Sequence, residues 1–513
     1  MLGKKYNPIP VIIGVGQVND RNEADRQSPG LDSLGLMEAA LRAADNDAGG
    51  GWLRRLDSLG VVDQISFPQL GDVSAPLARL VGATPRFCYK SGYASGDSPL
   101  LLLNEAANRI GAGEISVAAV AGGEALRTAA RRAQAATQQP GAPQQPGAPA
   151  DNAVRAVALR RGPSYRHRYG LIAPVDVYPL YENAARASYG QTLAQAQAES
   201  AEIWSQFSKV AAENPGAWLR RVVSAEEIRT ATPANRPIAF PYLKLMVANS
   251  SVNQGAAFLI ASLDEARARG VPEEQLIYIG RGAAAHEPVD LMARANYSDS
   301  PSMRVSLRKA LELNGLTSAD LDYAELYSCF PCVPKMARRA IDWPLDRAAS
   351  VFGGLTFGGG PVGNYMSHTV VSLALKLRAS GRRGLLFANG GLATHNHSMV
   401  LSRDPFAANI FPQNFDFQAE ADALRGAVPP VDENYLGPAT LETYTVFYDR
   451  SGAPLGGAVI ARATTGARFI AKVPAEDAAT IAWLTSGEQE PVDARGTAIL
   501  GADGDTRWIR SVQ

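Results

Sequence analysis

The chain alternates between short runs that are apolar throughout and longer stretches whose apolar positions recur every three or four residues. Runs such as 9–16 (IPVIIGVG) and 384–393 (GLLFANGGLA) contain or end in glycines, a pattern typical of strands buried on both faces of a sheet. The first of these runs is predicted as a strand of the parallel type. The stretches 31–45 and 99–110 have helical spacing and predict helices. The alternation of the two patterns predicts an α/β protein.

One strand–turn–helix–strand unit occurs twice, and its first copy begins at a glycine/serine turn. Residues 93–98 (YASGDS) form this turn, with Ser98 as the predicted N-cap and Pro99 as the first helical residue. The helix opens with PLLLL, which is apolar all round and predicts burial in the middle of a domain. The amides and the helix dipole at Gly96–Ser98 would favour an anion or an oxyanion. A strand at 115–125 (ISVAAVAGGEA) completes the unit.

The second copy begins at residues 352–368 (FGGLTFGGGPVGNYMSH), which contain six glycines. Glycines at this density let the backbone approach another backbone or a ligand closely. Ser367 is the predicted N-cap of a helix over 369–379, and the strand 384–393 follows. Because each copy places a glycine turn before a buried helix, the sequence predicts a ligand pocket where these turns converge.

Three further segments interrupt or extend this duplicated core. Residues 138–149 repeat QQPGAP twice and predict a flexible linker. Residues 164–232 are helical and rich in tyrosine, and their aromatic side chains are predicted to form a subdomain core rather than to stack on a substrate. Residues 441–500 contain short alternating strands and predict a small OB-like β-barrel. The predicted divisions are 1–126, 127–241 (inserted loop domain), 242–285, 286–405 and 406–513.

Composition and charge narrow the possible partners. Hydrophobic residues make up 46% of the 513 residues and charged residues 19%, which permits a large core. Lys+Arg and Asp+Glu both number 50, so no basic footprint for nucleic acid is expected. Three cysteines are too few for a disulfide framework and suit a reducing compartment. Because no signal peptide or membrane span is apparent, the sequence predicts a cytoplasmic protein without a membrane span.

Reactive side chains gather at two other places. Residues 322–331 (DYAELYSCFP) place Tyr327 and Cys329 together after a predicted strand, and Cys332 completes a C-x-x-C pair. A single pair with no further ligands nearby does not make a zinc site, so no metal is predicted. The sequence THNH places His397 beside the last glycine turn, either where α/β sheets bind ligands or in an exposed loop. Gly14-x-Gly16 lacks the third glycine of a dinucleotide fingerprint.

The duplicated unit and four motifs, in their order along the chain, resemble the thiolase superfamily. The motifs are SSVNQGAA, ELYSCF, FGGLTFGGGPVGN and FANGG. The resemblance extends over residues 8–405 and is greatest to sterol-carrier-type thiolases and to thiolase-like proteins, often labelled acetyl-CoA acetyltransferases, with an extra C-terminal domain. It implies a duplicated βαβαβαββ fold in five α-β-α-β-α layers with an inserted loop domain. It also implies Claisen-type acyl transfer on CoA thioesters, and no cofactor besides that coenzyme A thioester.

The chemical positions of the family are nevertheless replaced. The resemblance puts the nucleophilic cysteine at Gly96, and the family's Asn-Glu-Ala-Phe or His-Asp-Cys-Phe at 327–330 (YSCF). The family's Gly-His-Pro becomes Gly359-Gly360-Pro361, and its final Cys-x-Gly becomes 388–390 (ANG). Since glycine cannot form a thioester, ordinary thiolysis is not expected.

The sequence therefore leaves three hypotheses, all with an acyl-CoA small molecule as ligand. They are an acyl-CoA enzyme working without the usual cysteine, an aldolase-type relative acting on β-hydroxyacyl-CoA, and a non-catalytic acyl-CoA binder. The resemblance leaves the oligomeric state open between dimer and monomer. The predicted catalytic residues are Tyr327, Cys329, His368, His397 and Asp97, and the predicted substrate-binding residues are Gly96, Ser98, Gly359, Gly360, Asn389 and Gly390.

Overall fold

The structure is a computed structural model that describes residues 8–21, 30–137, 155, 159, 164–406 and 410–511. The QQPGAP repeat, predicted to be a flexible linker, lies outside the described residues. Nine strands form the sheet of the core. They are β1 (Pro10–Asn19), β2 (Ser58–Val61), β3 (Phe87–Lys90), β4 (Val117–Ala125), β7 (Asn253–Ser262), β8 (Ile277–His286), β9 (Tyr323–Leu326), β10 (Arg383–Gly390) and β11 (His395–Ser402).

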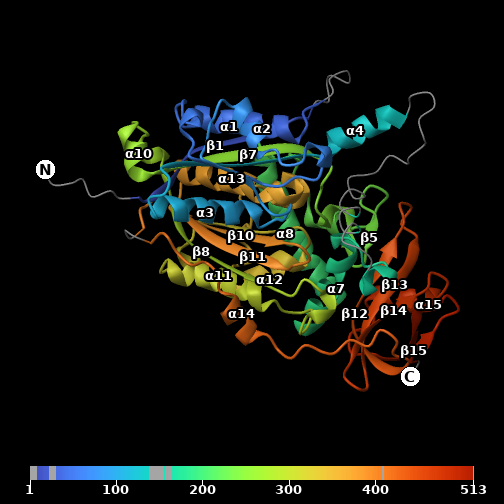
Figure 1. Cartoon of the computed structure of the whole chain (residues 1–513). Helices are drawn as coiled ribbons and strands as arrows, with labels where there is room; N and C mark the ends of the chain where they lie inside the picture. The colour runs from blue at the N-terminus through green and yellow to red at the C-terminus, as the bar shows by residue number, and fades with distance from the viewer. Residues whose placement is uncertain are drawn as a thin grey trace.

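Helices cover both faces of these strands and fill the space between them. The core helices are α1 (Ser33–Asp47), α2 (Ser74–Leu80), α3 (Ser98–Gly111), α10 (Leu263–Ala268), α11 (Pro301–Leu313), α12 (Cys332–Ala340) and α13 (Tyr365–Ala379). Figure 1 shows five layers: α1 and α2, then β1 and β7, then α3 and α13, then β8, β10 and β11, then α11 and α12. The predicted α-β-α-β-α architecture is confirmed, and the two apolar helices are the central layer.

The strand order shows the duplication directly. The sheet runs β3-β2-β4-β7-β1-β8-β11-β10-β9, and it passes from one half to the other through only two residue pairs between β1 and β8. When the strands of each half are numbered from its own start, the described strands give the orders 3-2-4-5-1 and 2-3-4-1, which agree once the additional edge strand β3 of the first half is left out. In each half the last strand, β7 or β11, is antiparallel to its neighbours. The predicted repeat of one folding unit is therefore confirmed.

The prediction of β1 as a strand of the parallel type is wrong. β1 pairs antiparallel with β7 along nearly its whole length, and antiparallel with β8 at Val11 and Ile12. A uniformly apolar run records burial on both faces, which a central antiparallel strand experiences as well as a parallel one. Whether the neighbouring strands run parallel or antiparallel depends on the path of the chain between them, and the sequence pattern of the strand does not reveal it.

The inserted region consists mainly of helices. It contains α4 (Leu126–Thr137), α6 (Tyr165–Arg168), α7 (Pro174–Ser188), α8 (Leu193–Glu213) and α9 (Ala225–Arg229), followed by β5 (Pro237–Ala239) and β6 (Tyr242–Leu243). Trp204, Phe207 and Trp218 are buried, and the rings of the first two lie 5.2 Å apart. The predicted packing role is confirmed, but Trp204 and Phe207 join the same buried cluster as residues of both core halves and do not form a separate subdomain core. Among the described residues, no helix combines the length and apolar character needed to cross a membrane.

The C-terminal region closes into the predicted small barrel. After α14 (Gln418–Leu424), it contains β12 (Gly437–Tyr448), β13 (Pro454–Ala463), β14 (Arg468–Val473), α15 (Ala478–Ser486), β15 (Arg495–Leu500) and β16 (Thr506–Arg510). The strands follow the order β12-β13-β14-β16-β15, and β15 pairs back onto β12. Strand β16 was not predicted from the sequence, because five residues with two arginines carry little alternation.

The barrel is joined to the inserted region and to the core. Strand β5 pairs with β12 at Ala239 and Phe447, so the insertion adds to the sheet of the barrel. Figure 1 shows the barrel beside α7, and Asn183 of that helix donates a hydrogen bond to the carbonyl oxygen of Tyr444 at 2.9 Å. Arg468 on β14 is fully buried and reaches the backbone of residues 292–295 in the second core half. The barrel is therefore hydrogen-bonded both to α7 and to the second half of the core.

Candidate active site

The turn before α3 is closed by its own hydrogen bonds. Helix α3 begins at Ser98, and Asp97 occupies the N-cap position without making a capping hydrogen bond. The Asp97 carboxylate instead accepts a hydrogen bond from the Ser95 hydroxyl. The Ser98 hydroxyl donates to the carbonyl oxygen of Tyr93 at 3.2 Å. The prediction of Ser98 as the N-cap is therefore wrong, because this side chain closes the turn while its backbone is already helical.

Gly96 has no room for a side chain. A Cβ atom built on it would overlap the carbonyl oxygen of Asn389 and the hydroxyl of Tyr327, and would lie 2.6 Å from Tyr327 Cζ. Gly390 is pressed against the same turn, since a Cβ there would lie 2.6 Å from Asp97 Oδ1. The turn before α3 and the end of β10 therefore meet with backbone close to backbone, and the tyrosine hydroxyl takes the space of a residue-96 side chain.

Tyr327 follows β9 and is held in a buried environment. Its ring lies edge-on to Tyr365, with 5.5 Å between the ring centroids. Burial raises the pKa of Tyr327 well above its ordinary value, and the nearby Cys329 and Asp97 raise it further. The hydroxyl therefore stays protonated at neutral pH and can act as a proton donor. Behind it, the Tyr365 hydroxyl donates to Glu325 at 2.8 Å, and burial raises the pKa of that carboxyl group to about 7.

Both cysteines of the C-x-x-C pair are buried thiols. Burial raises the pKa of Cys329 to about 12, although a hydrogen bond with Tyr178 opposes the shift. Burial also raises the pKa of Cys332 well above its ordinary value, and its Sγ lies 3.8 Å from the carbonyl oxygen of Tyr178. Because the thiolate is the nucleophilic form, neither side chain has the electrostatic environment of a reactive cysteine.

Tyr178, on α7, belongs to this site although the sequence analysis did not select it. Its hydroxyl donates to Asn389 Oδ1 at 3.0 Å and accepts from the backbone amide of Ala393 at 2.8 Å. The Asn389 amide group then donates to Asn396 Oδ1 at 2.9 Å, and Asn396 donates to the Ser302 hydroxyl at 2.8 Å. The side chain of Asn389 is therefore fixed by hydrogen bonds that lead to α7 and α11. The backbone carbonyl oxygen of Asn389 faces Gly96. A tyrosine within an insertion full of buried aromatics gave no separate signal.

His397 is a neutral, buried imidazole near the start of α3. Burial lowers its pKa from 6.5 to about 4, and the charge of Asp97 opposes the shift. Its ring lies 5.3 Å from that of Phe415. The exposed-loop alternative for the THNH sequence is therefore wrong for His397, which lies buried on β11. His395 is half-buried and lies 2.8 Å, through Nε2, from the Tyr93 hydroxyl.

The second glycine stretch packs against a different part of the chain. Gly359 has a φ of 107°, and a Cβ on it would lie 2.8 Å from Cδ of Gln254. The backbone amide of Gly360 donates to the carbonyl oxygen of Asn249 at 2.8 Å. Gln254 also donates to the carbonyl oxygen of Gly358 at 2.9 Å. These contacts are made with the SSVNQGAA motif and with Asn249 directly before it, rather than with Tyr327, and they explain why glycines lie opposite this segment.

His368 lies in the first turns of α13 with the contacts of a core residue. The N-cap of α13 is Asn364, so the prediction of Ser367 is wrong; a short 3-10 turn over 362–364 starts the helix earlier. The His368 ring stacks on Phe352 at 5.0 Å, and Nδ1 lies 3.0 Å from Gln17 Oε1. Burial lowers its pKa to about 3. A catalytic role for His368 stays a prediction.

The structure thus gathers most of the predicted residues into one cluster at the N-terminus of α3 and separates the others. Among the described residues, no three His, Cys, Asp or Glu side chains form a group that could hold a metal ion. We call the gathered set the Gly96 cluster. It comprises Gly96, Asp97, Ser98, Tyr178, Tyr327, Cys329, Asn389, Gly390 and His397.

Comparison with known proteins agrees with this architecture. A family model described as "Thiolase-like protein type 1 additional C-terminal domain" matches residues 416–503. The crystal structure of a monomeric SCP2-thiolase-like protein type 1 from Mycobacterium smegmatis is 31% identical and has a TM-score of 0.80. That match covers 98% of this chain and 99% of that one. The chain belongs to the SCP2-thiolase-like type 1 family.

Solved structures of lower identity share the fold of the core, and one further protein matches part of the sequence. The Ltp2-ChsH2(DUF35) aldolase is 20% identical with a TM-score of 0.53, covering 79% of this chain and 99% of that one. Human mitochondrial 3-ketoacyl-CoA thiolase, solved with CoA, is 14% identical with a TM-score of 0.58, covering 77% and 98%. An acetyl-CoA acetyltransferase from Methanocaldococcus jannaschii is 24% identical over 180 residues, which are 35% of this chain and 43% of that relative.

In this thiolase-like protein, the substitution His368→Gln is expected to reduce the loss of unfolding free energy that occurs as the pH is lowered. Burial lowers the folded-state pKa of His368 from 6.5 to about 3, so the unfolded chain is protonated first as the pH falls. The stability contributed by the neutral ring is present above the unfolded pKa and is lost as the pH falls toward the folded one. Between about pH 7 and pH 5 this group alone accounts for about 2 kcal/mol of unfolding free energy.

Urea unfolding at these two pH values measures the effect. The exposed His286→Gln serves as the matched control and should lose as much stability on acidification as the unchanged protein. An equally large loss in His368→Gln would show that this imidazole is not the group that responds to acid.

Proposed function

We propose that this protein binds acyl-CoA thioesters at the Gly96 cluster and acts on them without a cysteine-bound intermediate. The observation that carries the proposal is the position of Tyr327, whose hydroxyl fills the space of the side chain that residue 96 lacks. The raised pKa values of Cys329 and Cys332 support it, because neither thiol is ionised at neutral pH. Coenzyme A, as the thioester, is then substrate or ligand, and the proposal includes no other cofactor.

Ligand binding and the absence of a covalent step can be tested together. Calorimetry with acetyl-CoA should give saturable binding. Intact-mass spectrometry after incubation with acetyl-CoA should give only the unmodified protein mass. An acetylated protein that breaks down on addition of CoA would contradict the non-covalent proposal. The absence of binding to any acyl-CoA at millimolar concentration would contradict the ligand itself.

A second candidate, carbon–carbon cleavage of a β-hydroxyacyl-CoA, is favoured by the protonation states around Gly96. The neutral His397 would take the proton of the β-hydroxyl group as the Cα–Cβ bond breaks, giving a carbonyl compound and the enolate of the shortened thioester. The protonated Tyr327 hydroxyl would then give its proton to the α-carbon. The proton held on His397 would pass to the resulting Tyr327 phenolate and restore its hydroxyl group. The core resembles that of the Ltp2-ChsH2(DUF35) aldolase. This resemblance supports a shared fold and does not by itself support the cleavage reaction.

Tyr327→Phe separates this candidate from simple binding. The phenylalanine ring keeps the edge-on contact with Tyr365 and removes only the hydroxyl. If Tyr327 is the proton donor, the rate of β-hydroxyacyl-CoA cleavage should fall by about 100-fold or more, with acyl-CoA affinity changed little. If the unchanged protein binds acyl-CoA but turns over neither acyl-CoA nor β-hydroxyacyl-CoA, the hypothesis that remains is a non-catalytic acyl-CoA binder. A cleavage rate that survives in Tyr327→Phe would rule out the proposed proton donor.

A further inference from the structure

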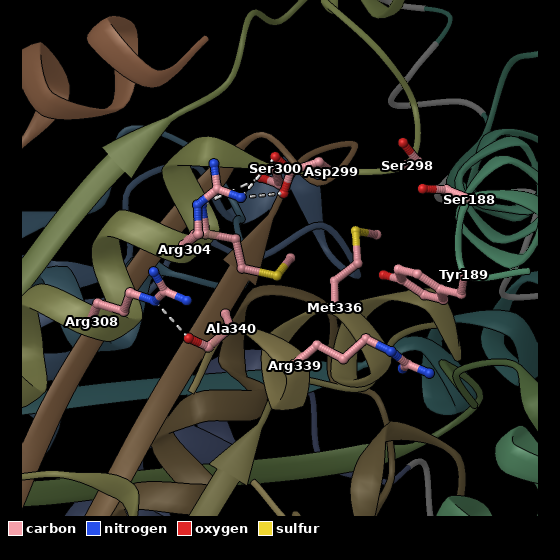
Figure 2. Close-up of a pocket in the computed structure, with 11 residues that line it drawn as sticks. Ser188, Tyr189, Ser298, Asp299, Ser300, Arg304, Arg308, Met336, Arg339 and Ala340 are labelled. Atoms are coloured by element: carbon pink, nitrogen blue, oxygen red, sulfur yellow. Dashed lines mark hydrogen bonds and ion pairs between the residues drawn. The ribbon is translucent and has the colours of Figure 1, made fainter. Parts of the chain in front are cut away.

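A separate pocket lies between the C-terminal ends of α7 and α12 and the N-terminal half of α11. Its volume is about 240 Å³. Figure 2 shows arginine side chains of α11 on one side, Tyr189 and Ser188 on the opposite side, and Met336 between them. The pocket shares no residue with the Gly96 cluster. Its lining is Ser188, Tyr189, Ser298, Asp299, Ser300, Met303, Arg304, Arg308, Met336, Arg339 and Ala340.

The arginines around this pocket outnumber the carboxylates that pair with them. Arg304 pairs with Asp299 at 2.9 Å, while Arg338 and Arg339 share Glu199 at 3.1 and 2.7 Å.

Arg308 has no acidic partner among the described residues; its Nε donates to the carbonyl oxygen of Ala340 at 2.8 Å, which holds the guanidinium at the pocket. Of the three arginines that line the pocket, Arg304 and Arg339 are in ion pairs, and Arg308 is in none among the described residues.

The remaining lining suits the organic part of an anionic ligand. Met303 and Met336 are buried and give the pocket an apolar part of its lining. The Tyr189 ring is held in place by Arg339, whose guanidinium lies 4.1 Å from the ring centroid. The Ser188 and Ser298 hydroxyl groups supply hydrogen-bonding positions at the edge, while the Ser300 hydroxyl caps α11 and donates to Glu287. Guanidinium groups match the geometry of phosphate oxygens, and an apolar lining beside them accepts the group that the phosphate carries.

We propose that this pocket binds the phosphate group of a small organic phosphomonoester. Arg308 is the principal phosphate contact, since it is the arginine whose charge is not already balanced. Arg304 adds a second contact once Asp299 yields part of its ion pair to the ligand. This site shares no residue with the Gly96 cluster, although Ser302, next to Met303 on α11, accepts the hydrogen bond from Asn396 that belongs to the network around Asn389.

AMP serves as the probe, with adenosine as the same molecule without phosphate. Calorimetry should show binding of AMP and none of adenosine at equal concentration. Arg308→Gln should weaken AMP binding about tenfold or more, as expected for the loss of a charged hydrogen-bond donor. Asp299→Asn should tighten it, because the substitution removes the negative charge at the rim. Arg382→Gln is the matched control, since this arginine is 72% exposed and pairs with Asp404 elsewhere on the surface.

Several outcomes would overturn the assignment. AMP that fails to bind at millimolar concentration would exclude a phosphomonoester site of useful affinity. Equal affinities in Arg308→Gln and Arg382→Gln would place bound AMP outside this pocket. Adenosine binding as tightly as AMP would show that the phosphate group is not what is recognised. Weaker AMP binding in Asp299→Asn would show that the carboxylate is a ligand contact and that the anion assignment is wrong.

Discussion

Replacing Gly96 with cysteine is expected to produce no thiolase turnover and to destabilise the fold. The new Cβ would overlap the Asn389 carbonyl oxygen and the Tyr327 hydroxyl, and a backbone carbonyl within a paired strand cannot move aside. Overpacking of a filled site costs about 1–3 kcal/mol, and more where the backbone must shift. The chemistry is also incomplete, because Gly360 and Ala388 supply neither an imidazole nor a thiol. Catalytic groups that act as a unit are strongly non-additive, so one restored group returns little rate.

The experiment compares Gly96→Cys with Gly92→Cys in the same loop. A Cβ on Gly92 has no atom within 4 Å, so that cysteine tests the added thiol without the steric conflict. Urea unfolding should show a loss of stability for Gly96→Cys alone, and neither variant should degrade acetoacetyl-CoA with CoA. Repeated turnover by Gly96→Cys would show that Tyr327 moves away readily and that the missing groups are not required.

Replacing Arg468 with methionine is expected to lower the free energy of unfolding by about 3 kcal/mol. The Arg468 side chain is 0% exposed and pairs with Glu442 at 2.6 Å. Its guanidinium also donates to the carbonyl oxygens of Met292 and Ala295, at 2.9 and 3.3 Å, and to that of Arg294. Methionine keeps much of the volume but leaves these acceptors without their donor, in an interface that excludes water.

Arg462→Met provides the matched control, because Arg462 pairs with the same Glu442 at 2.9 Å but is 33% exposed. Its loss should cost at most about 1 kcal/mol, as is usual for ion pairs near the surface. Urea unfolding measures both variants, and limited proteolysis should cut Arg468→Met faster between the core and the barrel. Equal losses in the two variants would mean that Arg468 stabilises only through Glu442, and that its contacts with residues 292–295 contribute nothing.

The site is only partly predictable from the sequence, and Tyr178 and Tyr327 illustrate the difference. Tyr327 lies in a short motif between a strand and a helix, so its neighbours along the chain mark it. Tyr178 lies within an inserted helix among other tyrosines, and its role depends on hydrogen bonds with residues 389 and 393, more than 200 positions away. Contacts over such separations are made by packing of complete elements and leave no local pattern.

The N-termini of α3 and α13 also differ from the sequence prediction. Ser98 and Ser367 are residues of the type that caps helices, but the caps are Asp97 and Asn364. Capping preferences describe helices whose ends are solvated, where a side-chain oxygen replaces water on the first amides. Both of these helices start inside the molecule. There, glycine turns packed on neighbouring strands decide where the helix begins.

By itself, the sequence determined the duplicated α/β unit, the two buried central helices, the C-terminal barrel and the presence of glycine, which has no side chain, at residue 96. These features follow from the period of apolar positions, from glycine content and from residue identity, which are local properties of the chain. Only the tertiary structure decided the direction of β1, the pairing of β5 with the barrel, and the use of the space beside Gly96 by Tyr327. Each of these depends on which elements pack together, because burial favours any arrangement that removes apolar surface from water, and the specific partner is chosen by fit.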